Sequence, residues 1–580
     1  MNKKLICILA LLLAATLLCG CGGLPARLAD NLAHEREDYA VRELCRFEDM
    51  PYERPDLDAL RDKAAQLEAA LEGSASYRKV TGLLDEVYAM YNSFDTMTTI
   101  ADIRNCQDLS DEFYAEEYAW SLAAQAEVSQ IMEEVYLSCG SSRLAERLAR
   151  DYFWDGFLEE YGPESESVLT DEYVELAAKE SELVAQYRSL TLNPVIEIDG
   201  EEWLFTDWVY NAEDDDEISR GYDAYYEKYN PLLGELYIRM VEIRKEQAKL
   251  LGYDSYAEMM FELGYGRDFG VEESDRFVQS VRENLVPLAR NLESAGVRDS
   301  IWYSRVDESD LEEVLEYTAN SLGWQAREAY QFMTRYHLYD LAPSENKAQM
   351  SFQTYLADYE APYLFINPNG STEDILTVTH EFGHYVEGFA SFNTFRTMDL
   401  AECFSQAMQY LALEPMRELY VDEEVDNLLR MNLLDTLDTY LTQASFAAFE
   451  RAVFEEEELS VEKLNALSLQ LAKDFGYFDG TSVDYYAKSW VDITHFFEQP
   501  FYVISYPASA GVALEIYELE LKEPGAGFEK FRELIEAEDP GLVGAAAEAG
   551  LQPPLTTRRV EEITSFLEEQ LAADSLTWAA

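Results

Sequence analysis

Basic side chains are scarce in this sequence. Its 580 residues include 44 lysines and arginines against 113 aspartates and glutamates, which gives a formal net charge of -69. A surface of this charge repels phosphate backbones, so we expect no nucleic-acid partner. The acidic surplus is typical of the solvated helix faces that keep a protein soluble.

The N-terminus lacks an apolar run long enough to span a bilayer comfortably. The run at residues 5–18 is too short, and two lysines precede it. Residues 18–23, at the end of this run, resemble the bacterial lipoprotein signal. In that signal a cysteine after a small residue is lipidated and becomes the new N-terminus. Cys21 fits that position better than Cys19, because Gly20 precedes the former and bulky Leu18 the latter. We therefore expect an extracytoplasmic protein held on the bacterial cell membrane by a lipid on Cys21.

Cysteines are also few, seven in all. Beyond the signal and the anchor, the remaining ones are Cys45, Cys106, Cys139 and Cys403. Their long spacings match no zinc-ribbon pattern, which excludes that class of metal site. One disulfide among the first three is possible in an oxidising compartment, and the sequence favours no particular pairing.

Apolar residues are plentiful, at 48% of the chain, so disorder is excluded. The length exceeds one ordinary hydrophobic core and predicts two lobes. Amphipathic helical periodicity begins near Asp56, and a hairpin signal around Asp199-Gly200 marks a change of pattern. The predicted divisions are a lipoprotein signal peptide at 1–20, an N-terminal helical lobe at 21–195 and a catalytic lobe at 196–580.

The apolar run from Ala361 to Asn367 predicts a strand, because it follows a proline-containing start and ends at a turn rich in proline, asparagine and glycine. Helical periodicity resumes after Ser371. Ser371 and Asp374 form a start that resembles a capping box. The sequence therefore predicts a helix that begins near residue 371 and runs beyond Phe389, with a strand directly before it.

Only five histidines occur in the chain, and two of them stand in the motif His380-Glu381-Phe382-Gly383-His384. Residues four apart lie on one face of a helix, so both imidazoles can reach one metal ion. Glu381 lies beside them, placed to act on a metal-bound water rather than to bind the metal. This pattern predicts a catalytic metal centre.

Zinc at such a centre needs a third protein ligand and an open position. Glu402 lies on the next predicted helix, far enough along the chain to turn and return antiparallel to the first. Asp399 is an alternative, although it precedes the apolar periodicity and looks like a helix-start residue. Glu387 is a weaker alternative, because it comes after His384 on the same helix and is better placed for outer contacts.

Four segments together resemble the thimet oligopeptidase family of zinc peptidases, and most closely its oligoendopeptidase F branch. They are residues 248–258, 362–370, the His380 motif and Ala401-Glu402-Cys403-Phe404-Ser405. The resemblance implies that Glu402 is the third ligand of one zinc ion. It also implies a mostly α, bilobed helical body around a deep central channel, with a small β-sheet beside the active-site helix.

A further block at residues 490–506 resembles the histidine and tyrosine motif of the same family. The resemblance implies that His495 and one or both of Tyr502 and Tyr506 face the bound peptide. A tyrosine hydroxyl aimed at developing negative charge stabilises the oxyanion of the transition state. The block carries one extra residue, Pro500, which leaves the choice between the two tyrosines open.

The motifs predict a zinc-dependent endopeptidase that hydrolyses internal bonds of short unfolded peptides by attack of a metal-activated water. Glu381 would be its general base. A peptidyl-dipeptidase is an alternative, because related channel-shaped enzymes share the His380 motif. A peptide-binding lipoprotein without catalysis is a third possibility. It is less favoured, since a pure binder gains nothing evident from Glu381.

Lipidation of Cys21 can be tested directly. Cells that express the protein should incorporate radioactive palmitate into it, and a Cys21→Ser variant should carry no label because the acylated thiol is missing. Fluorography of the purified protein measures this. Label that persists on the variant would contradict the assignment of Cys21.

Overall fold

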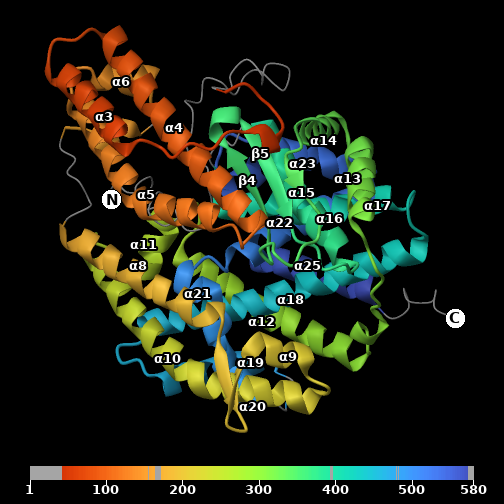
Figure 1. The fold of residues 1–580 in the computed structure, drawn as a ribbon. Coiled ribbons are helices and arrows are strands. Elements are labelled where there is room, and N and C mark those ends of the chain that lie inside the picture. The colour runs from red at the N-terminus through yellow and green to blue at the C-terminus, as the bar shows by residue number, and fades with distance from the viewer. Residues whose placement is uncertain are drawn as a thin grey trace. The chain divides into compact units, whose positions relative to one another are not determined.

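The computed structural model describes residues 42–154, 156–163, 171–391, 396–478, 480 and 482–572. The predicted signal peptide and Cys21 lie outside these residues. Helices make up most of the described chain, and the sheets are small (Figure 1), which confirms the predicted mostly helical fold. None of the described helices combines the length and the apolar composition needed to cross a membrane.

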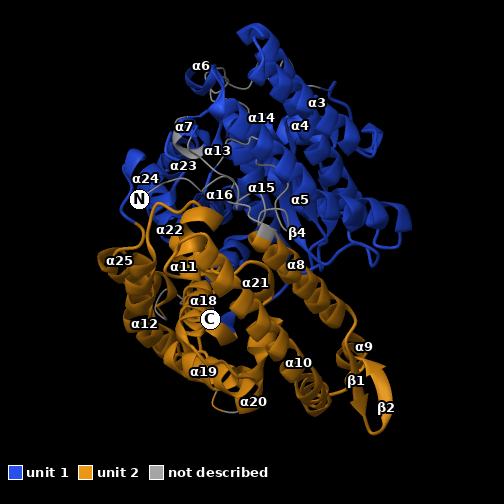
Figure 2. Cartoon of the chain, turned by 90° about the vertical axis from the view of Figure 1, so that its left-hand side faces the viewer, with its two compact units in different colours: residues 1–167, 300–433, 509–553 blue, residues 168–299, 434–508, 554–580 orange. Residues whose placement is uncertain are grey.

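The chain forms two compact units, each assembled from three separate stretches of sequence (Figure 2). Unit 1 consists of residues 1–167, 300–433 and 509–553. Unit 2 consists of residues 168–299, 434–508 and 554–580. The sequence boundary at residue 195 and the deep channel stay predictions.

Unit 1 holds the small sheet and the helices around it. Its helices and strands are α3 (Leu57–Glu72), α4 (Tyr77–Gln107), α5 (Glu112–Ser141), α6 (Ala145–Asp151), α7 (Phe157–Tyr161), α13 (Glu308–Leu322), α14 (Trp324–Tyr336), β3 (Tyr339–Asp340), β4 (Ser351–Leu356), β5 (Ala361–Ile366), α15 (Glu373–Ser391), α16 (Met398–Leu411), α17 (Leu413–Met416), α23 (Ala526–Glu536) and α24 (Leu542–Glu548). Short 3-10 turns lie at Phe47–Asp49 and Ala357–Tyr359.

Unit 2 is helical apart from one hairpin. Its elements are α8 (Asp171–Leu192), β1 (Val195–Ile198), β2 (Glu201–Leu204), α9 (Phe205–Asn211), α10 (Asp215–Leu250), α11 (Tyr256–Met259), a π-helical turn at Met260–Gly264, α12 (Val271–Ser294), α19 (Val461–Asp474), α20 (Val483–Lys488), α21 (Thr494–Glu498) and α25 (Thr557–Leu571), with 3-10 turns at Arg298–Ser300 and Ser489–Asp492. Two helices, α18 (Asp422–Glu455) and α22 (Ser505–Lys522), contribute residues to both units.

The hairpin predicted around Asp199-Gly200 is confirmed. Strands β1 and β2 pair antiparallel, and the turn residues Asp199 and Gly200 have φ values of 56° and 83°. Two successive left-handed residues are what a tight two-residue hairpin turn requires, because their twist matches that of the strands. An aspartate followed by glycine adopts this geometry at low cost.

The sheet of unit 1 has the strand order β3-β5-β4. Strand β5 pairs parallel with β3 and antiparallel with β4, and all six of its residues are buried. A strand covered on both faces reads as a continuous apolar run, which is why the sequence revealed it. Helix α15 packs on β4 and β5, so the predicted strand and the predicted sheet beside this helix are confirmed.

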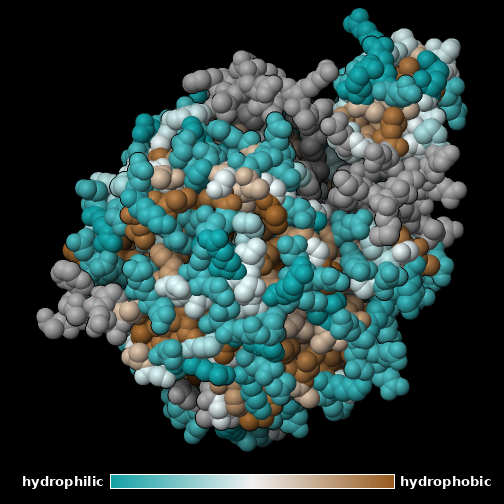
Figure 3. All heavy atoms as spheres, turned by 180° about the vertical axis from the view of Figure 1, so that it is seen from behind, coloured by the Kyte–Doolittle hydropathy of each residue, from teal (hydrophilic) through white to brown (hydrophobic). Residues whose placement is uncertain are grey.

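The face drawn in Figure 3 is dominated by hydrophilic side chains, and hydrophobic ones gather in small separate groups. This pattern agrees with the acidic surplus of the sequence. The cysteines of the described part, Cys45, Cys106, Cys139 and Cys403, form no disulfide. The disulfide considered among the first three is therefore absent from this structure, and Cys106 and Cys139 are buried as thiols.

Helices α15 and α16 lie side by side (Figure 1), and their backbones come into close contact at Gly383. A Cβ atom at Gly383 would lie 2.3 Å from the carbonyl oxygen of Phe404 and 2.7 Å from Cα of Ser405. Both are backbone atoms of α16, which cannot move aside like the end of a flexible side chain. Only glycine allows this approach, although it weakens a helix by about 1 kcal/mol relative to alanine.

We expect Gly383→Ala to destabilise the protein by about 1–3 kcal/mol, because overpacking would outweigh the better helix propensity of alanine. Gly388→Ala is the matched control on the same helix. Its Cβ would meet its nearest atoms at 3.5–3.9 Å, which is ordinary contact. Urea unfolding of both variants measures the difference, and equal midpoints would contradict a steric requirement at Gly383.

Candidate active site

The start of α15 is fixed by the carboxylate of Asp374. Its two oxygens accept hydrogen bonds from the backbone N–H groups of Asn369, Gly370 and Ser371, at 3.1, 2.7 and 3.2 Å. In return, the Ser371 hydroxyl accepts from the N–H of Glu373 at 3.3 Å. This reciprocal arrangement agrees with the capping box that the sequence predicted. It sets the point at which the chain leaves the sheet and enters the helix.

Further along α15, His380 and His384 point toward Glu402 on α16. The Nε2 atoms of His380 and His384 lie 3.7 and 3.9 Å from Oε2 of Glu402. One ligand atom from each residue lies within 4.8 Å of the other two. Three nitrogen and oxygen donors at this spacing could hold one divalent ion and leave a position open. The structure thus brings together the three residues that the sequence proposed as ligands.

Two outer contacts orient these donors. Nδ1 of His380 lies 3.2 Å from Oε1 of Gln409, so Nδ1 is the donor and Nε2 is the nitrogen that a metal could bind. Gln409 in turn donates to Oδ1 of Asn432 at 3.2 Å. The Ser405 hydroxyl lies 3.2 Å from Oε2 of Glu402 and fixes that carboxylate. Hydrogen bonds of this kind commonly accompany metal ligands.

Burial adjusts the protonation of His384. It lowers the pKa of the imidazole to about 4, against the opposing attraction of Glu402 and with a smaller lowering effect from His380. His384 is therefore neutral at neutral pH. Neutral imidazole is the form that binds metal ions.

Glu381 faces the sheet side of α15 and is only 5% exposed. Burial raises the pKa of its carboxyl group to about 7, which His380 opposes and Glu402 reinforces. The Ser351 side chain and the Gln353 backbone on β4 lower this pKa in turn, because they favour the ionised form. A carboxyl group with a pKa near neutrality is suited to accept and return a proton.

The two alternatives for the third ligand lie outside the cluster. Asp399 is fully buried in the first turn of α16 and is not one of the three clustered residues. Glu387 accepts a hydrogen bond from Nε of Arg396 at 3.0 Å. This contact matches the outer role that its position on α15 suggested.

The remaining predicted site residues belong to unit 2, where they form a group of their own. The rings of His495 and Tyr502 stack with centroids 5.3 Å apart, and Tyr502 and Tyr506 meet edge to face at 5.2 Å. The Tyr506 hydroxyl lies 3.3 Å from Nε2 of His495. The structure therefore brings these three side chains together with one another. Their approach to the residues of unit 1 stays a prediction.

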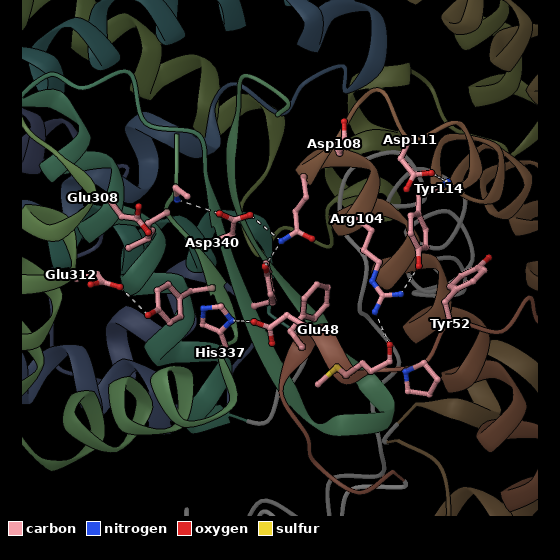
Figure 4. Close-up of a pocket in the computed structure, with 18 residues that line it drawn as sticks. Glu48, Tyr52, Arg104, Asp108, Asp111, Tyr114, Glu308, Glu312, His337 and Asp340 are labelled. Atoms are coloured by element: carbon pink, nitrogen blue, oxygen red, sulfur yellow. Dashed lines mark hydrogen bonds and ion pairs between the residues drawn. The ribbon is translucent and has the colours of Figure 1, made fainter. Parts of the chain in front are cut away.

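A separate cavity of about 690 Å³ lies in unit 1 between α4 and the sheet (Figure 4). Its walls include none of the predicted site residues. Many of its polar groups are paired with one another: His337 contacts Glu48, Gln107 donates to Asp340 at 2.9 Å, and Arg104 donates to the Tyr114 hydroxyl at 2.6 Å. These contacts give His337 a structural role, so we place the chemistry at the His380 cluster.

Sequence reasoning missed Gln409 and did not foresee the close contact at Gly383. Gln409 lies seven positions after Glu402 on α16, a spacing that returns to the same helix face. A search of that face for polar residues would have found it. The contact at Gly383 leaves no such signal, because a glycine in a helical pattern does not reveal which backbone approaches it.

Family comparisons cover much of the chain. The model of the Peptidase M3 N-terminal domain matches residues 47–176, and that of Peptidase family M3 matches residues 323–533. Together they span more than half of the sequence, and the second includes the complete His380, His384 and Glu402 cluster. No curated protein matches the chain.

Solved structures share the fold. A protein named oligoendopeptidase F is 22% identical with a TM-score of 0.75, over 91% of this chain and 98% of its own. PZ peptidase A with an inhibitor is 21% identical with a TM-score of 0.75, over 91% and 99%. An oligoendopeptidase F from Bacillus anthracis str. Ames is 21% identical with a TM-score of 0.73, over 91% and 98%. At these identities the likeness establishes the fold, and the family models establish the lineage: the chain is a peptidase that belongs to peptidase family M3.

Proposed function

We propose that the protein is a zinc-dependent endopeptidase that hydrolyses internal bonds of short unfolded peptides. The observation that carries the proposal is the convergence of His380, His384 and Glu402, with Glu381 beside them on α15. Membership of a peptidase family supplies the reaction class. The names of the solved relatives, which include oligoendopeptidase F, support short peptides as substrates.

The donor set suits zinc. Two imidazoles and one carboxylate with an open position form a common ligand set of catalytic zinc. The neutral state of His384 and the hydrogen bond at Nδ1 of His380 prepare both nitrogens for binding. When bound there, a zinc ion would polarise the scissile carbonyl and lower the pKa of a water molecule toward neutrality.

Glu381 is the proton carrier in this scheme. It accepts a proton from the attacking water and passes it to the leaving amine, so it must change charge twice in each turnover. Its raised pKa, near 7, makes both transfers accessible at neutral pH. The Ser351 side chain and the Gln353 backbone on β4 favour the ionised form of this carboxylate.

His495, Tyr502 and Tyr506 are the proposed stabilisers of the oxyanion. Tyrosine hydroxyls donate hydrogen bonds to charge that develops on the substrate oxygen. The stacking of Tyr502 on His495 and the contact between Tyr506 and His495 would keep both tyrosines against the imidazole. We leave open which tyrosine makes the direct contact.

We further propose that a lipid on Cys21 anchors the enzyme to the outer side of the bacterial cell membrane. The sequence of residues 1–21 supports this location, and those residues lie outside the described part of the chain. The acidic composition supports peptides over nucleic acid as partners.

Replacement of Glu381 by Gln should lower kcat by about 10²–10⁴-fold, because the amide cannot accept the proton of the attacking water. Zinc content should stay near one per chain, since Glu381 is not one of the three clustered donors. Glu373→Gln, an exposed carboxylate in the first turn of the same helix, is the matched control and should keep full activity. A Glu381→Gln variant with undiminished turnover would exclude the proposed base.

Product analysis separates an endopeptidase from a peptidyl-dipeptidase. A peptide with an amidated C-terminus should still be cut at internal bonds, and a chelator should stop the reaction. Mass spectrometry of the fragments, with and without the chelator, provides the measurement. Cleavage that removes only dipeptides and fails on the amidated peptide would favour the peptidyl-dipeptidase. Bound zinc without hydrolysis of any peptide in a mixed pool would favour a peptide-binding protein.

A further inference from the structure

The segment of residues 494–506, here called the tyrosine segment, contains an unusual backbone conformation. Phe501 has a φ of 65° and is 3% exposed. Bulky residues rarely adopt left-handed backbone, because Cβ crowds the following carbonyl oxygen. Such conformations persist only where the surrounding structure enforces them. Phe501 directly precedes Tyr502, so its backbone sets the direction in which the Tyr502 side chain leaves the turn.

Buried polar groups hold this turn from two sides. The N–H of Phe501 donates to Oε1 of Glu450 at 2.7 Å. The carbonyl oxygen of Phe501 accepts from Nη1 of Arg267 at 2.9 Å. The other guanidinium nitrogen of Arg267, Nη2, lies 3.0 Å from Oγ of Ser505. One carboxylate and one guanidinium thus fix both sides of the left-handed residue and link it to the start of α22.

Further polar side chains hold the backbone of the tyrosine segment on the N-terminal side of Phe501. The Tyr265 hydroxyl donates to the carbonyl oxygen of Pro500 at 2.9 Å. Arg244, which is fully buried, donates to the carbonyl oxygen of Phe496 at 2.7 Å and to that of Phe497. These two carbonyls come directly after His495. The backbone next to His495 and Tyr502 is therefore held by buried polar residues, and Tyr506 follows Ser505, whose hydroxyl contacts Arg267.

Burying these polar groups would be unfavourable if they served the stability of the fold alone. Glu450 has no exposed surface, and its second oxygen, Oε2, has no hydrogen-bond partner among the described residues. Burial of a polar or charged group is expensive, and apolar side chains of similar volume commonly give equal or better stability. Glu450 makes one hydrogen bond, to the N–H of Phe501, and the positive charges of Arg244 and Arg267 lie near its carboxyl group.

We propose that Glu450 and Arg267 are positioning residues that hold Phe501 in its left-handed conformation and thereby keep Tyr502 and Tyr506 against His495. The proposal rests on the proposed peptidase function for its catalytic consequence. Neither residue needs to touch the substrate, because both act through the backbone of the tyrosine segment.

The Glu450 pair of variants provides the main test. Glu450→Gln keeps an oxygen that can accept a hydrogen bond from the N–H of Phe501. Burial raises the pKa of the Glu450 carboxyl group to about 8, so the glutamine amide resembles the neutral form of the glutamate. Glu450→Leu keeps the volume and removes the acceptor. We expect Glu450→Leu to lower kcat by about 10–100-fold with KM within about twofold, because misplaced catalytic groups affect the transition state. Glu450→Gln should restore kcat to within about threefold of the unmodified enzyme.

A second pair covers the case in which Glu450→Leu does not fold. Arg267→Lys keeps the positive charge but cannot reach both the Phe501 carbonyl and Ser505 with one rigid planar group. Arg298→Lys is its matched control in unit 2, where Arg298 makes a two-bond contact to Asp438 away from the tyrosine segment. Arg267→Lys should lower kcat in the same range, whereas Arg298→Lys should leave it unchanged.

A spectroscopic readout makes the test independent of turnover. The chain has only five histidines, so the imidazole resonance of His495 can be assigned in histidine-labelled protein with a His495→Asn variant. This resonance should shift in Glu450→Leu and Arg267→Lys and stay in place in Glu450→Gln and Arg298→Lys. Absence of hydrolysis by the unmodified protein would overturn the proposed function. In that case the position of the His495 resonance in the variants would still test the positioning role. An unchanged resonance with unchanged kcat in both altering variants would overturn the positioning role, even if their melting temperatures fell.

Discussion

The close contact between α15 and α16 at Gly383 is the constraint on which the cluster of His380, His384 and Glu402 depends. The two histidines occupy one helix and the carboxylate occupies the next, so their separation is set by how near the two backbones come. A side chain at Gly383 would collide with the backbone of Phe404 and Ser405, just after Glu402. The ligand distances of 3.7 and 3.9 Å are therefore consequences of an absent Cβ atom. The sheet and the capped turn before α15 fix where this helix begins, and so fix the positions of its two histidines along the helix axis.

The sequence predicted best what depends on local spacing. The histidine pair follows from helical periodicity, the β1–β2 turn from an aspartate-glycine pair, and β5 from a continuous apolar run bounded by turn residues. Each of these signals lies within a few residues of chain. The prediction that Glu402 lies near the two histidines depended on the resemblance to a family. The approach of two helices is a property of their packing, and no spacing in the sequence encodes it.

The features that escaped prediction involve partners distant in sequence. Gln409 and Asn432 lie on different helices, and their hydrogen bond orders the outer side of the His380 imidazole. Phe501 meets Glu450 across 51 positions and Arg267 across 234. Left-handed backbone at a phenylalanine contradicts local preference, so no local rule would suggest it. Departures of this kind are expected where function, rather than stability, selects the conformation.

The assembly of unit 1 from three separate stretches has a consequence for the order in which the protein becomes active. The segment that leads into Glu402 is secured by the last of these stretches: Thr397 donates its N–H to the carbonyl oxygen of Pro540 at 2.8 Å, and the Ser509 hydroxyl donates to the carbonyl oxygen of Asp399 at 2.7 Å. These contacts cannot form until the ribosome has made the stretch of residues 509–553. A growing polypeptide that ends before this stretch therefore lacks the contacts that secure the start of α16, and peptidase chemistry is delayed until the stretch has been made.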